Sequence, residues 1–109
     1  MSMTRDDVMR LSGRELDEAV ARDVLGLTWS PVAGPVPYSR DIDAAWQVVE
    51  HLATPDEALT ITYVKGDWVV AVGGAEVVVS SKNAPEAICR AALLSALKRS
   101  EAKNGGGGA

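Results

Sequence analysis

The first 26 residues contain two segments in which apolar residues recur at helical spacing. Thr4 followed by two aspartates is typical of a capped first turn, which predicts a short helix to about Arg10. Ser12 with Glu15 three residues later matches a capping box, so a second helix is expected to begin there and to end at Gly26. The apolar stripe of this helix comprises Leu16, Ala19, Val20 and Val24, and its expected solvated face comprises Asp17, Glu18, Arg22 and Asp23.

The middle of the chain changes from a proline-rich loop to another amphipathic pattern. Residues 27–38 hold three of the five prolines and cannot continue a helix. A helix is predicted from about Arg40 to Ala53, with Ser39 as its N-cap and residues 54–56 after its end. Its apolar stripe is Ile42, Ala45, Trp46, Val49 and Leu52. His51 lies off this stripe and is expected at the surface.

Three runs rich in β-branched residues follow, at 58–64, 67–72 and 75–80. The joints between them contain glycine, which predicts a three-stranded antiparallel meander. In the first run, Thr60, Thr62 and Val64 fall on one face, and Leu59, Ile61 and Tyr63 on the other. The middle run is almost continuously apolar, so its strand is expected to be covered on both faces.

The last amphipathic segment predicts a helix with a well-formed start. Asn83 is its expected N-cap, Pro85 lies in the first turn, and Glu86 complements the positive helix end. The sequence predicts a single domain at residues 1–103, followed by a flexible glycine-rich tail at residues 104–109. The order of elements predicts an α+β fold, an αβα sandwich in which a three-stranded antiparallel meander packs against three helices.

The composition restricts the class of function. With 11 basic and 15 acidic residues in 109, the chain has a formal net charge of −4, which disfavours binding to duplex nucleic acid. One cysteine allows no internal disulfide and fits a reducing compartment. No signal peptide is evident and no apolar run approaches the length of a membrane span, so the expectation is a cytoplasmic protein without membrane contact.

Residue sets for catalysis are missing from the sequence. It has no Walker or dinucleotide-binding glycine loop, no CxxC or HExxH pair, and no nucleophile elbow. Cys89 is interpreted as a buried structural thiol, and the single histidine makes no metal site. We therefore expect no enzyme activity, no metal and no cofactor.

Arg90 is the strongest candidate for binding chemistry. It lies among small and apolar residues one turn inside the last helix, where its guanidinium either forms a salt bridge at the polar edge or faces a phosphate or carboxylate. Trp29 in the proline-rich loop either packs as a lid on the core or stacks on a ligand. Tyr38 and Ser39 stand at another helix start, and Trp68 provides a further ring for stacking on a base.

Three segments in order resemble the phage ABA-sandwich domain family: "SGRELDEAVARDVLGL", "PVPYSRDIDAAWQVVEHL" and "APEAICRAALLSAL". The resemblance covers roughly residues 12–97. It implies a small phage or prophage protein in the cytoplasm of an infected bacterial host. The family is also similar to the first type of phage anti-Thoeris proteins, homo-oligomers that sequester cyclic ADP-ribose isomers, and in some cases cyclic oligonucleotides, without cleaving them.

This resemblance implies a counter-defence protein that sequesters a small anionic cyclic nucleotide. The ligand-binding residues would be Arg90, Tyr38, Ser39, Asp41, Trp68 and Trp29, with Asp41 either capping its helix or accepting from a ribose hydroxyl. The alternative is a non-enzymatic phage accessory protein that acts through protein–protein contacts. A pocket lined by Arg90 and an aromatic ring would favour sequestration, whereas a flat apolar patch would favour protein contacts. A small nucleotide hydrolase is a third hypothesis.

Overall fold

The computed structural model describes residues 4–53, 58–73 and 77–107. Its element order is α1 (Arg5–Arg10), α2 (Gly13–Ala19), η1 (Val20–Val24), α3 (Ile42–Leu52), β1 (Leu59–Val64), β2 (Asp67–Val72), β3 (Val77–Ser81) and α4 (Ala84–Gly107). The predicted α+β class with a three-stranded antiparallel meander is confirmed. Two predicted features lie outside the described residues: the segment after α3 at 54–56 and the start of the third strand.

Local signals explain where the first helices begin and end. Thr4 caps α1 through a reciprocal pair of bonds, in which the Thr4 hydroxyl accepts from the Asp7 amide at 3.2 Å and the Asp7 carboxylate accepts from the Thr4 amide at 2.9 Å. The capping box predicted at Ser12 is wrong, because the Ser12 side chain makes no capping bond. Gly26 follows η1 with a positive φ of 64°, a conformation that glycine adopts without strain.

Helix α3 starts two residues later than predicted. Asp41 is its N-cap and accepts a hydrogen bond from the Asp43 amide at 2.9 Å, whereas Ser39 belongs to the preceding turn. The predicted stripe is correct for Ala45, Val49 and Leu52, which are buried. Ile42 and Trp46 are instead about half exposed, since Ala44 and Val48 complete the buried face.

The strands pair in the order β1-β2-β3, and β1 and β2 join through a two-residue turn at Lys65-Gly66. Both turn residues have positive φ, 50° and 91°, as a hairpin turn of the primed type requires. Directly opposed residues share a face of the sheet, so Ile61, Val70 and Val79 point to the same side. This side is the inner face, because Val70 and Val79 are buried in the core.

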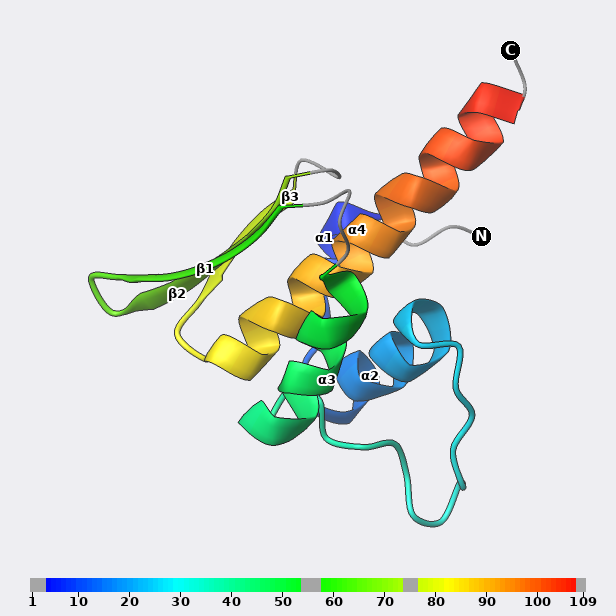
Figure 1. Ribbon diagram of the computed structural model, residues 1–109. Coiled ribbons are helices and arrows are strands. Elements are labelled where there is room, and N and C mark those ends of the chain that lie inside the picture. The colour runs from blue at the N-terminus through cyan, green and yellow to red at the C-terminus, as the bar shows by residue number, and fades with distance from the viewer. Residues whose placement is uncertain (1–3, 54–57, 74–76, 108–109) are drawn as a thin grey trace.

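Helix α4 lies between the sheet and the other helices. It packs on β2 and β3 with one side and on α1, α2, η1 and α3 with the other, and the described helices all lie to one side of the sheet (Figure 1). The expectation that β2 is covered on both faces is therefore wrong. Val69 and Ala71, on its outer face, stay half-buried. Helix α4 also extends through Gly107, into the segment predicted as a flexible tail.

Candidate functional site

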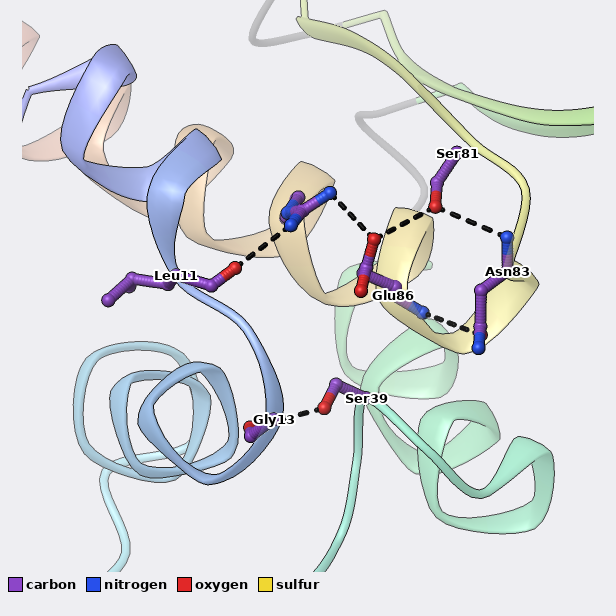
Figure 2. A network of polar contacts seen from close by, with 7 residues as sticks. Leu11, Gly13, Ser39, Ser81, Asn83 and Glu86 are labelled. Atoms are coloured by element: carbon purple, nitrogen blue, oxygen red, sulfur yellow. Dashed lines mark hydrogen bonds and ion pairs between the residues drawn. The ribbon is translucent and has the colours of Figure 1, made fainter.

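The first turn of α4 carries a network of polar side chains. The Asn83 side chain caps the helix as predicted, accepting from the Glu86 amide at 3.3 Å. The Ser81 hydroxyl donates to Glu86 Oε1 at 3.0 Å and accepts from the Asn83 amide at 3.2 Å (Figure 2). These bonds hold the carboxylate of Glu86 beside the positive end of the helix, where the helix dipole stabilises it.

Arg90 is the next member of this network. Its Nη1 donates to Glu86 Oε1 at 2.7 Å, and its Nη2 donates to the Leu11 carbonyl at 2.9 Å. The side chain is only 14% exposed, and its Nε is buried without a hydrogen-bond partner among the described residues. The guanidinium therefore connects α4 to the segment between α1 and α2. Its charge is already balanced by Glu86, which weakens its attraction for an anion.

Ser39 belongs to a second polar network, built around a buried carboxylate. Asp17 Oδ1 accepts from the Ser39 amide at 2.7 Å, and Oδ2 accepts from Arg40 Nη2 at 2.8 Å. The Ser39 hydroxyl donates to the Gly13 carbonyl at 3.3 Å (Figure 2). The prediction that Asp17 faces solvent is wrong, since its side chain is fully buried. Both oxygens of Asp17 tie the turn before α3 to α2.

Tyr38 lies in the core and is 2% exposed. Burial raises the pKa of its hydroxyl, and the nearby Cys89 and Asp17 add to the rise. Burial also raises the pKa of the Cys89 thiol far above its ordinary value, with the carboxylates of Asp17 and Glu86 adding to it. Cys89 is therefore the buried structural thiol expected from the sequence. A buried Tyr38 cannot border an open pocket in this conformation.

None of the remaining predicted binding residues is hydrogen-bonded to Arg90, whose described partners are Glu86 and the Leu11 carbonyl. Trp29 is half-buried and packs against the core, which fits the lid interpretation. Asp41 is exposed and caps α3. Trp68 packs at the edge of the core, and its ring centroid is 4.9 Å from that of Tyr63, with the rings tilted by 53°. Tyr63 is 59% exposed, so this pair presents an aromatic surface near the β1–β2 turn.

The outer face of the sheet carries exposed apolar side chains. It is formed by Thr60, Thr62, Val64, Asp67, Val69, Ala71, Val78 and Ser80. Asp67, opposite Val64 beside the β1–β2 turn, is charged and lies 3.6 Å from Lys82 Nζ. The other seven side chains are uncharged, and Val78 and Val64 are 57% and 48% exposed. The alternation of Thr60, Thr62 and Val64 along the first strand indicates this face. We did not predict its exposure, because the apolar middle strand indicated burial on both sides.

Two further observations concern metals and membranes. Within the described ranges, no group of three or more His, Cys, Asp or Glu side chains is arranged to hold a metal ion. A helix with the length and apolarity needed to cross a bilayer is likewise not found in the part of the chain that the structure describes.

Comparisons with known proteins agree with the architecture. The model of the phage ABA sandwich domain matches residues 18–93. The fold is also similar to the 2.0 Å crystal structure of a phage protein from Bacillus cereus ATCC 14579, with a TM-score of 0.60 and 29% sequence identity over 78% of this chain and 92% of that chain. A search among curated proteins gave no match.

Proposed function

Because the chain belongs to the phage ABA sandwich domain family, we propose that it is a phage accessory protein that acts by binding another protein through the outer face of its sheet. Its role as a phage accessory protein is supported by the family match and by the similar phage protein from Bacillus cereus. The observation that carries the mode of action is the partly apolar outer face, on which Val64 and Val78 are exposed and the one charged residue, Asp67, lies at the turn end.

The chemistry of this face fits a protein surface better than a small anion. Burying its apolar side chains favours contact with another apolar surface, and burying its threonine and serine hydroxyls costs little where the partner offers them hydrogen bonds. The net charge of −4 opposes association with nucleic acid. Apolar side chains exposed together on one face and bordered by polar ones are typical of protein–protein contacts.

A charge placed on the face tests this proposal. Immobilised wild-type protein and the variants Val78→Lys and Val32→Lys are each incubated with cytosol from infected and uninfected host cells, and retained proteins are quantified by mass spectrometry. Val32 is almost fully exposed in the loop after η1, so Val32→Lys adds the same charge away from the sheet. We expect a partner that Val32→Lys retains and Val78→Lys loses, with the same result when the purified partner is titrated by calorimetry. Equal retention by both variants would contradict the proposal.

Sequestration of a cyclic nucleotide is the second candidate function, and the Tyr63–Trp68 pair is the observation that favours it. Exposed aromatic rings bind nucleobases by stacking, which contributes about 1–3 kcal/mol per base. Trp68 was a predicted ligand residue, and Ser81 beside it on β3 leads directly into the first turn of α4. In the homo-oligomer that the family resemblance implies, each subunit would contribute one such pair of aromatic rings.

This candidate has its own assay. The protein is incubated with a cyclic ADP-ribose isomer made by an active TIR-domain enzyme, and free nucleotide is filtered away. The bound fraction is then recovered by heating and identified by mass spectrometry. Intact nucleotide that is lost in Trp68→Ala but kept in Trp46→Ala supports sequestration, since Trp46 is a half-exposed tryptophan on α3. A cleaved product would instead identify a hydrolase, and no retained cyclic nucleotide would reject both nucleotide functions.

A further inference from the structure

The two edges of the sheet differ in how they are protected. At the β3 edge, Arg5 Nη2 reaches the Val78 carbonyl at 3.5 Å, so a charged side chain lies over that strand. The β1 edge has the sequence LTITYV, which contains no charged residue, no proline and no glycine. Natural sheets usually block an open edge with lysine, proline or a bulge. The β1 edge shows none of these devices, and such an edge is a template for another strand.

The hairpin geometry determines which backbone groups of β1 point outward. In a two-residue hairpin the residues that flank the turn, here Val64 and Asp67, exchange both ladder bonds. The bonding direction alternates along the strand, so Leu59, Ile61 and Tyr63 direct their N–H and C=O groups away from β2. The Gly73 amide donates to the Ala58 carbonyl at 2.7 Å, which agrees with this alternation.

We propose that the β1 edge binds β1 of a second copy of this chain, antiparallel and around a twofold axis at Ile61, to form a continuous six-stranded sheet. In this register Ile61 faces Ile61 of the second copy, Leu59 faces Tyr63, and Thr60 faces Thr62. Each facing pair lies on the same side of the sheet in both copies, so the inner apolar face and the outer face both continue across the axis. Because the strand is uncharged, the twofold places no like charges opposite each other.

The size of the outer face explains why a second copy would matter. Three strands spaced by about 4.8 Å, each about 20 Å long, give a footprint of about 300 Å². A specific interface usually needs about 800 Å² per partner. Joining two sheets doubles the outer face, which brings it closer to that size. The inference rests on the proposed binding function for its purpose, although the pairing of the strands can be measured without any partner.

The first test measures mass in solution by light scattering at about 100 μM protein. We expect twice the mass of one chain for the wild type and a single-chain mass for Ile61→Pro, which removes an outward N–H without breaking a bond to β2. Ser80→Pro is the matched control, because its amide points outward at the opposite edge. It should keep the double mass. Circular dichroism checks that both variants remain folded. A wild type that stays monomeric, or a dimer that survives Ile61→Pro, would overturn the proposal.

The second test reads the register directly and does not depend on a proline variant that folds. Thr60 and Thr62 are both exposed, and in the proposed register they face each other across the axis as a non-hydrogen-bonded pair, close enough for a disulfide. The double variant Thr60→Cys/Thr62→Cys should form covalent dimers with oxidised glutathione, whereas each single variant should not, since its thiols lie diagonally apart. Absence of covalent dimer in the double variant, or equal crosslinking in the single variants, would refute this register.

These outcomes are separate from those of the proposed function. A dimer that forms as expected but retains no host or phage protein leaves the strand pairing standing and rejects the binding role of the outer face. If the protein is monomeric and still binds a partner, the strand pairing is rejected and the binding role of the outer face stands.

Discussion

Replacing the buried carboxylate of Asp17 should destabilise the fold substantially. Its two oxygens accept from the buried Ser39 amide at 2.7 Å and from Arg40 Nη2 at 2.8 Å. Asp17→Ala removes both bonds and leaves the Ser39 amide buried without an acceptor. A buried donor that loses a charged acceptor costs about 1–3 kcal/mol. We expect the free energy of unfolding to fall by about 2–3 kcal/mol, within a total of about 5–15 kcal/mol for a domain of this size.

The Arg40→Ala variant isolates the ion pair from the backbone bond. The Arg40 side chain is 57% exposed, so the pair is partly screened by water, and its loss should cost at most about 1 kcal/mol. Asp17→Asn keeps one oxygen for the Ser39 amide and should fall between the two alanine variants. Urea unfolding followed by tryptophan fluorescence measures all three differences, provided that the slope of the transition stays constant.

Either of two results would contradict this stabilising role of the Asp17 carboxylate. If Asp17→Ala cost less than about 0.5 kcal/mol, the carboxylate would not hold the turn before α3, because such a value is that of an ordinary surface substitution. If Arg40→Ala cost as much as Asp17→Ala, the ion pair rather than the Ser39 amide would supply the stability. The Asp17→Asn variant then distinguishes the charge of the side chain from its shape.

Three shorter predictions concern other parts of the fold. Arg90→Ala should lower the free energy of unfolding by about 1.5–3 kcal/mol, since it removes a bond to the charged Glu86 and one to the Leu11 carbonyl. Arg90→Lys should recover only part of this loss, and a thermal melt unchanged from wild type would contradict the prediction. Cys89 should not react with Ellman's reagent at pH 8 until the protein is unfolded, because burial raises the pKa of its thiol; fast labelling of the native protein would exclude this. Lys65→Asn should raise the free energy of unfolding by about 0.5 kcal/mol, because asparagine adopts the positive φ of 50° before Gly66 more readily than lysine. A lower melting temperature would show that contacts of the Lys65 side chain outweigh its backbone strain.

The sequence predicted those elements whose signals are local. Thr4, Asn83 and Gly26 mark helix ends through bonds or backbone angles within a few residues, and the β-branched runs pair as expected. The start of α3 was misplaced because Ser39 and Asp41 are both good N-cap residues. Asp17, 22 residues earlier, accepts the Ser39 amide and fixes Ser39 in the preceding turn, so the choice depended on a contact distant in the sequence.

The same distinction applies to the candidate site. Arg90 was correctly placed one turn inside α4, but its partner at Leu11 is 79 residues away, and no spacing rule predicts that contact. Asp17 was assigned to the solvated face because it is charged and lies off the main apolar stripe. Its burial follows from a backbone segment that needs an acceptor, a requirement visible only after the chain has folded.

The buried polar side chains indicate where function can reside. Ser95 donates to the Ala91 carbonyl, Ser39 donates to the Gly13 carbonyl, Asp17 accepts from an amide, and Arg90 donates to the Leu11 carbonyl. Each of these groups satisfies a backbone atom within the fold, and groups committed in this way are not available to a ligand without a cost in stability. Binding must then use the surfaces that the fold leaves open. The outer face of the sheet is one such surface in the described chain. The charge substitution at Val78 tests binding at this face, and the strand-edge substitution at Ile61 tests the dimer that would enlarge it.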